Sequence, residues 1–127
     1  IVLPAASEVD AANCSDAMAM AAETKAGELR SWSEVYAWFK RYRKCDDGAI
    51  AEGFTESITL LLAKQWPALP QLSARADKDA QFRAFVLKHI DESADADNLR
   101  LIEENAKTKC PSNYRKLCGA FIKRMRK

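Results

Sequence analysis

Apolar residues recur along most of this chain at intervals of three or four, the spacing that places side chains on one face of an α-helix. The clearest run has offsets of 0, 4, 7, 8 and 12 and consists of Phe54, Ile58, Leu61, Leu62 and Trp66. Stripes of the same kind run through residues 14–22, 31–44, 79–90, 97–106 and 112–125. No segment alternates between apolar and polar residues for long enough to predict a strand. The pattern predicts an all-α protein, a compact bundle of five to seven helices.

Polar residues mark where several of these helices begin. Residues 31–34 read Ser-Trp-Ser-Glu, a capping box that predicts a helix start. Asp46 and Asp47 precede the next apolar stripe, where carboxylates favour the positive end of a helix. Residues 67–72 carry two prolines and predict an ordered apolar connector, because a proline ends the preceding helix. Residues 93–97 predict an acidic loop that caps a later helix.

Length and composition fit one folded domain. The chain has 127 residues, of which 48% are hydrophobic and 30% charged, so it can bury one modest core. We assign residues 14–127 to a single helical domain. Residues 1–13 open with IVLPAAS, which fits a signal remnant, a tag or a flexible N-terminus. No apolar stretch approaches the roughly 18 residues of a membrane helix, so we predict no membrane span.

The charge balance argues against nucleic acid as a partner. There are 20 basic and 18 acidic residues, for a net charge of +2. Two basic stretches, residues 40–44 and 123–127, are expected to be solvated helix ends, since cations suit the negative end of the helix dipole. We therefore predict no nucleic-acid partner.

The cysteines predict covalent cross-links. Zinc sites and thioredoxin-like redox sites need close pairs such as C-x2-C. No such pair occurs, and the one histidine, His89, lies near no cysteine in the sequence, so we predict no metal and no cofactor. An even number of cysteines favours disulfides in a short chain whose opening residues fit a secretory signal. Of the three pairings, the sequential one closes the shorter loops and is our prediction, with four reduced thiols as the alternative: Cys14–Cys45 and Cys110–Cys118.

Candidate catalytic residues have simpler explanations. His89 lies four residues after Phe85 on an apolar face, which predicts a core-edge histidine bonded to the backbone; pairing with Cys45 or a serine is the catalytic alternative. Asp46, Asp47 and Glu52 could suggest acid–base chemistry, but helix capping already explains Asp46 and Asp47. No motif of a known hydrolase, metalloprotease or nucleotide-binding loop occurs. We predict that the protein is not an enzyme.

Three cysteine-containing stretches carry a family resemblance. Residues 14–17 read CSDA, residues 45–54 read CDDGAIAEGF, and residues 110–118 read CPSNYRKLC. A small helical chain with this layout resembles the periplasmic immunity proteins of type VI secretion amidase effectors. The resemblance implies a periplasmic protein that binds a secreted peptidoglycan amidase and blocks its active-site cleft. Such proteins often self-associate, so it also implies a homodimer as a possible assembly.

Blocking a cleft requires a rigid protrusion, because ordering a mobile loop on binding costs affinity. The stiffest candidates are residues 45–48, next to a predicted disulfide, and residues 66–72, which contain the prolines. The acidic loop of residues 93–98 is a third candidate that would complement a basic cleft rim. The side chains that we expect to contact the partner are Asp46, Asp47, Trp66, Leu69, Asp95 and Asp97.

Two other functions fit the same layout. A periplasmic stress chaperone would open with pH and bind many clients through exposed apolar surface. A helical small-ligand-binding protein would use its aromatic residues to line a cavity between helices.

Overall fold

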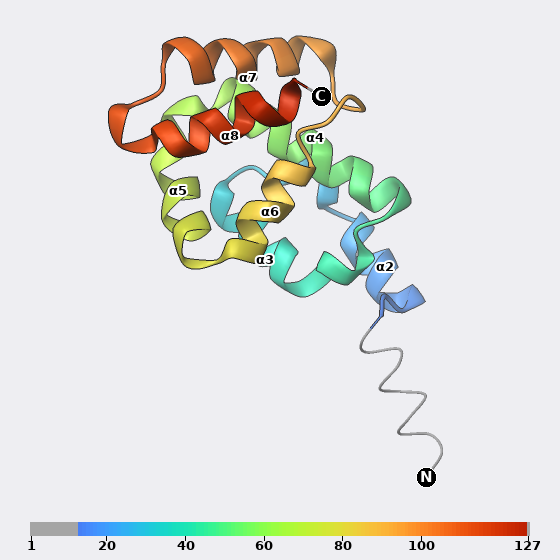
Figure 1. The fold of residues 1–127 in the computed structure, drawn as a ribbon. Coiled ribbons are helices and arrows are strands. Elements are labelled where there is room, and N and C mark those ends of the chain that lie inside the picture. The colour runs from blue at the N-terminus through green and yellow to red at the C-terminus, as the bar shows by residue number, and fades with distance from the viewer. Residues whose placement is uncertain (1–12, 127) are drawn as a thin grey trace.

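The computed structural model describes residues 13–126, in which seven α-helices are joined by turns and four short 3-10 helices (Figure 1). The all-α prediction of five to seven helices is confirmed. The prediction for residues 1–13 lies almost wholly outside the described residues. The α-helices are α2 (Asp16–Glu23), α3 (Trp32–Tyr42), α4 (Gly48–Lys64), α5 (Leu69–Lys78), α6 (Ala80–Lys88), α7 (Ala96–Thr108) and α8 (Arg115–Met125); the 3-10 helices are η1 (Ala26–Glu28), η2 (Arg43–Cys45), η3 (Trp66–Ala68) and η4 (Ser112–Tyr114).

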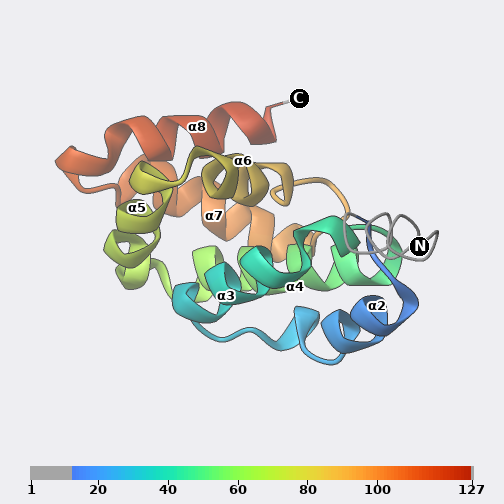
Figure 2. The same cartoon turned by 90° about the horizontal axis from the view of Figure 1, so that it is seen from below.

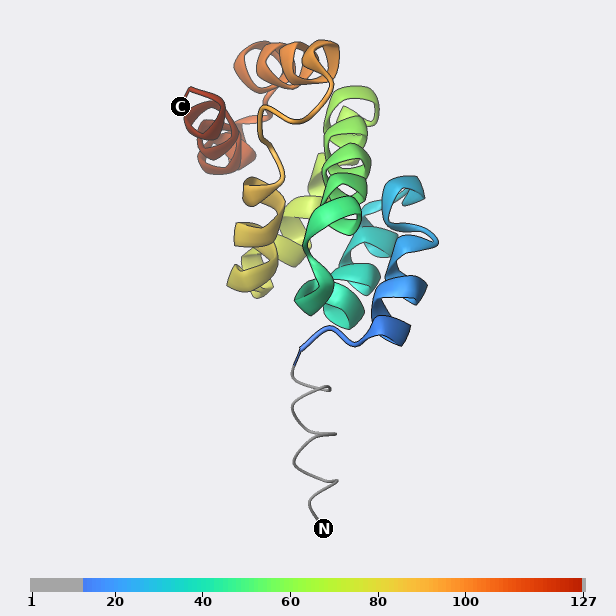
Figure 3. The ribbon, with the colours of Figure 1, turned by 90° about the vertical axis from the view of Figure 1, so that its right-hand side faces the viewer.

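Helix α4 runs through the middle of the bundle. Helices α2 and α3, together with η1, pack on α4 toward one end of the molecule (Figures 1 and 3). Helix α7 packs on α4 at the other end, and α8 lies beside α7. The pair formed by α5 and α6 joins these groups, since α5 contacts α3 and α6 contacts α8 (Figure 2). All of these elements share one hydrophobic core.

Aromatic rings fill the part of the core where α3, α4 and α6 meet. The Phe39 ring centroid lies 5.3 Å from that of Phe82 and 4.8 Å from that of Phe85. Phe54 lies edge-on to Phe85 at 5.0 Å. Such pairs contribute about 0.5–1.5 kcal/mol each beyond their burial. These rings contact one another, so they act as core packing.

Side chains cap several helix starts, and the predicted caps within residues 31–34 and 93–97 are confirmed. Ser31 Oγ accepts from the Glu34 amide at 3.1 Å, and Glu34 Oε1 accepts from the Arg30 amide at 2.9 Å. Asp79 and Asp95 cap α6 and α7. The prediction that residues 67–72 form a connector is wrong. They belong to η3 and to the first turn of α5, with each proline in the first two helical positions, where a missing N–H costs no hydrogen bond.

Two disulfides cross-link the bundle with the predicted sequential pairing. The first joins Cys14, before α2, to Cys45 at the end of η2. The second joins Cys110, before η4, to Cys118 within α8. Disulfides form and persist in oxidising compartments, so the chain is consistent with folding outside a reducing cytosol. Within residues 13–126, no helix is both long and apolar enough to cross a bilayer.

Candidate functional site

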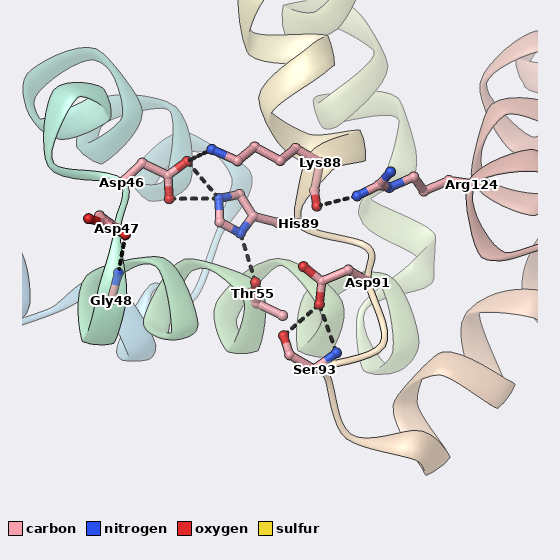
Figure 4. Close-up of polar contacts among 9 residues, drawn as sticks. All are labelled: Asp46, Asp47, Gly48, Thr55, Lys88, His89, Asp91, Ser93 and Arg124. Carbon is pink, nitrogen blue, oxygen red and sulfur yellow. Dashed lines mark hydrogen bonds and ion pairs between the residues drawn. The ribbon is translucent and has the colours of Figure 1, made fainter. Parts of the chain in front are cut away.

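A buried histidine joins three parts of the bundle (Figure 4). His89 follows the last turn of α6 and is 2% exposed. Its Nδ1 lies 2.7 Å from Thr55 Oγ1 in α4. Its Nε2 lies 3.0 Å from Oδ2 and 2.9 Å from Oδ1 of Asp46, between η2 and α4. His89 is thus in the core as predicted, but the predicted backbone partner is wrong, because both ring nitrogens face side chains.

Asp46 is the charged end of this network. Its side chain is 6% exposed and also accepts a hydrogen bond from Lys88 Nζ at 2.8 Å. Burial is the largest single effect on the pKa of Asp46 and raises it. Hydrogen bonds from His89 and Lys88, with their attraction, together outweigh burial, so the net pKa is lowered. The prediction that Asp46 caps a helix is wrong, because Asp47 is the N-cap of α4.

The chain that leaves His89 is held in a fixed direction. Arg124 of α8 donates from Nε to the Ile90 carbonyl at 3.2 Å and from a terminal nitrogen to the Lys88 carbonyl at 3.0 Å. Asp91 Oδ1 accepts from the Ser93 amide at 2.8 Å and from its hydroxyl (Figure 4). The buried histidine and these turn contacts together fix the start of the acidic loop of residues 93–98.

The order of hydroxyl, imidazole and carboxylate is the one that nucleophilic catalysis uses. A hydroxyl nucleophile has to reach a substrate carbonyl, however. Thr55 is 4% exposed, and its hydroxyl points toward His89 between the helices (Figure 4). The arrangement therefore suits a structural link between α4, α6 and η2. Among residues 13–126, no three His, Cys, Asp or Glu side chains gather in a group that could hold a metal ion.

An acidic surface lies on the outer side of α4. Glu52, Glu56 and Leu60 follow one another at four-residue intervals and are all exposed. A groove of about 450 Å³ separates this stripe from residues 93–98, and another of about 350 Å³ separates it from α2 and η1. The residues that line the two grooves include no lysine or arginine. We call the five exposed carboxylates of these grooves the acidic surface: Glu23, Glu28, Glu52, Glu56 and Asp95.

The second groove depends on a close approach of backbones. The Cα of Gly53 lies 3.6 Å from the point that a Gly27 Cβ would occupy, and a Cβ on Gly53 would lie 2.9 Å from the Gly27 amide nitrogen. Ser57 ties the same elements together, since its hydroxyl donates to the Ala26 carbonyl at 2.6 Å and accepts from the Leu29 amide at 3.1 Å. Helix α4 therefore holds η1, and with it Glu28, at a fixed separation.

The predicted partner contacts divide into two groups. Asp47, Asp95 and Asp97 are exposed. Trp66 and Leu69 are 8% and 2% exposed and belong to the core, and Asp46 is enclosed in its ion pair. The side chains of Trp66, Leu69 and Asp46 therefore face the protein interior. Trp66 and Leu69 are buried because the segment predicted as a connector is helical and packs on the core. Of the exposed three, Asp95 lies in a groove wall.

Glu56 and Thr55 are not among the residues singled out from the sequence, and Glu52 is considered there only for acid–base chemistry. The signal for the two glutamates was present, because they lie opposite the apolar stripe that includes Phe54 and Ile58. The contact between Thr55 and His89 spans 34 residues, and no local pattern encodes it.

The fold and site define a class: an all-α protein with two disulfides, one core and an acidic surface built on its central helix. Searches of protein-family models, curated proteins and solved structures find no match to the chain.

Proposed function

We propose that the protein is a periplasmic immunity protein, which binds a secreted peptidoglycan amidase of type VI secretion and blocks its cleft without chemistry of its own. The family resemblance supplies the partner class, and the acidic surface supports a docking role. Five carboxylates around two grooves, with no cation in the lining, favour a partner with a basic rim. A homodimer stays a prediction of the resemblance.

Rigidity also supports this proposal. The acidic surface is carried by α4, whose other side is buried in the core and whose N-terminus follows the Cys14–Cys45 bridge. A surface that is ordered before binding avoids the entropic cost of ordering on contact.

The test uses the purified protein and a secreted amidase encoded beside its gene. Binding is measured by calorimetry, and amidase activity is measured on peptidoglycan fragments. Glu52→Lys with Glu56→Lys should weaken binding at least about tenfold, mainly through slower association. The matched control is Asp77→Lys with Glu104→Lys, which makes the same change in net charge at exposed positions outside the grooves.

Two results would overturn the proposal. Wild-type protein that neither binds nor inhibits the amidase at micromolar concentration would refute the immunity function. Equal affinities for the groove variant and the control variant would refute the acidic surface as the docking site.

A further inference from the structure

One histidine connects the two walls of the groove between α4 and residues 93–98. Thr55 lines that groove from α4, and Ser93 and Asp95 line it from the opposite wall. His89 begins the segment that leads to this second wall and faces Thr55 across the helix contact at 2.7 Å. The position of the wall relative to α4 is therefore fixed directly through His89.

Donor and acceptor counting determines where the imidazole proton lies. The Asp46 carboxylate is ionised and only accepts hydrogen bonds, so His89 Nε2, which faces it, has to carry a proton. Nδ1 then either accepts from the Thr55 hydroxyl or is protonated and donates to it. Among the hydrogen bonds of residues 13–126, Nδ1 is the one partner of Thr55 Oγ1. A protonated Nδ1 would leave the hydroxyl proton of a buried threonine without an acceptor, which is costly.

The charges around the ring favour the same state. Asp46 and Asp91 face or flank His89 with negative charge, while Lys88 on α6 and Arg124 on α8 supply positive charge. With a neutral imidazole these four charges sum to zero. A protonated His89 would pair with Asp46 but would raise the sum of these charges to +1, so the charges balance with the neutral ring.

We infer that His89 is held as the neutral tautomer with its proton on Nε2, and that it is the positioning residue that fixes residues 90–95 against α4. The consequence for partner binding rests on the proposed function. The tautomer and the positioning role do not, and they can be measured on the protein alone.

The tautomer is tested by nitrogen-15 NMR of the side chain. His89 is the one histidine of the chain, so its two ring signals need no assignment by mutation. At pH 7 we expect Nε2 as a protonated, pyrrole-type nitrogen and Nδ1 as an unprotonated, pyridine-type nitrogen. Two protonated nitrogens, or a proton on Nδ1 alone, would overturn the inference.

The positioning role is tested by Thr55→Val, which removes the hydroxyl and keeps the shape of the side chain. The Ile90 amide donates to the Leu87 carbonyl of α6, and the Ser93 and Ala94 amides donate to Asp91, so the hydrogen exchange of these three amides reports on the order of the segment. Thr55→Val should speed their exchange about tenfold, and Thr55→Ser, which keeps the hydroxyl, should restore it.

Thr59→Val is the matched control. Thr59 is 1% exposed on the same helix, and its hydroxyl donates to the Thr55 carbonyl at 2.7 Å without touching His89. The control should leave exchange of the three amides near the wild-type rate. Equal acceleration by both valine variants, or no acceleration by Thr55→Val, would overturn the positioning role.

The final arm measures amidase affinity. If wild type binds, Thr55→Val should lose affinity and Thr55→Ser should regain it, whereas wild-type affinity in Thr55→Val would show that the positioning does not serve binding. If wild type does not bind, the proposed function fails while the exchange and NMR results still decide the inference.

Discussion

Replacing Gly53 by alanine should destabilise the protein, although alanine is the better helix former. Gly53 lies within α4 at the point where η1 crosses it. A Cβ at this position would come within 2.9 Å of the Ala26 Cβ and of the Gly27 amide nitrogen, and 3.0 Å from the Ala26 carbonyl carbon. Two of these three atoms belong to the backbone, so no side-chain rotation can relieve the contact.

Two opposing contributions determine the sign of the change in unfolding free energy caused by Gly53→Ala. Alanine in a helix interior is favoured over glycine by about 1 kcal/mol. Adding a methyl group to a tightly packed site costs about 1–3 kcal/mol, and here the upper part of that range applies. Moving η1 away would also lengthen both hydrogen bonds of Ser57. We expect a net loss of about 1–2 kcal/mol, which for a chain of this size lowers Tm by about 4 to 8 °C.

Gly119→Ala provides a control for which we expect a change in stability of the opposite sign. Gly119 lies inside α8, is exposed, and has no heavy atom within 4 Å of the position of an added Cβ. The same substitution there should stabilise the protein by about 0.5–1 kcal/mol. Both variants are compared with wild type by urea denaturation and thermal melting. If Gly53→Ala were as stable as wild type while Gly119→Ala gained stability, the close approach of α4 and η1 would be refuted.

Two further predictions concern the buried carboxylate and the disulfides. Because the pKa of Asp46 is lowered in the folded state, its contribution to stability is present above the ordinary aspartate pKa of about 4 and is lost as pH falls through the folded value. Asp46→Asn should therefore flatten the acid decline of the unfolding free energy measured by denaturation at several pH values; parallel curves would contradict this. Replacing both cysteines of a bridge by serine should cost about 3.7 kcal/mol for Cys14–Cys45 and about 2.5 kcal/mol for Cys110–Cys118 in the chain-entropy model, given sequence separations of 31 and 8. A greater loss from the shorter loop in denaturation experiments would show that strain or local packing dominates.

The helical segments could be predicted from the sequence because each buries one face. Period and capping residues are local signals, and they identified every α-helix except α5. That helix is not predicted from the sequence because prolines at residues 67 and 70 commonly end a helix. Both occupy first-turn positions, where proline is compatible with a helix. The same residue type thus ends one helix and begins the next, and only the fold distinguishes the two cases.

The buried network could not be predicted from local patterns. Asp46 has the sequence context of a helix cap, and its neighbour Asp47 takes that role. Its partner His89 is 43 residues away. Thr55 sits beside Phe54 on α4 and has no feature that distinguishes it from other small buried residues. Local sequence patterns explain each of the three residues separately. They come together because the end of α6, which carries His89, packs against α4.

The acidic surface could be predicted from the sequence only in part. Glu52 and Glu56 could be placed on the outer face of α4 from the period alone. Glu28 joins them because η1 lies close to α4, which Gly53 permits, and Glu23 joins them because α2 packs on α4. A glycine within a helix lowers helix propensity, so its use here is explained by the backbone contact and by the groove that the contact forms.

Helix α4 combines several structural roles that bear on the proposed binding function and on its alternative, a holdase chaperone. Its apolar face packs in the core, Gly53 allows η1 to approach closely, and Thr55 forms a hydrogen bond with His89. The acidic surface is therefore supported by buried packing and hydrogen bonds. A holdase captures clients through apolar surface, yet among the described residues the large hydrophobic side chains exposed to solvent are Met20, at 72%, and Leu60, at 41%. They are isolated, on α2 and α4, and Leu60 adjoins the carboxylates. Single exposed apolar side chains are common on protein surfaces, whereas capture of many clients would need a larger continuous apolar patch, so among the described residues the exposed apolar surface gives no support to the chaperone alternative.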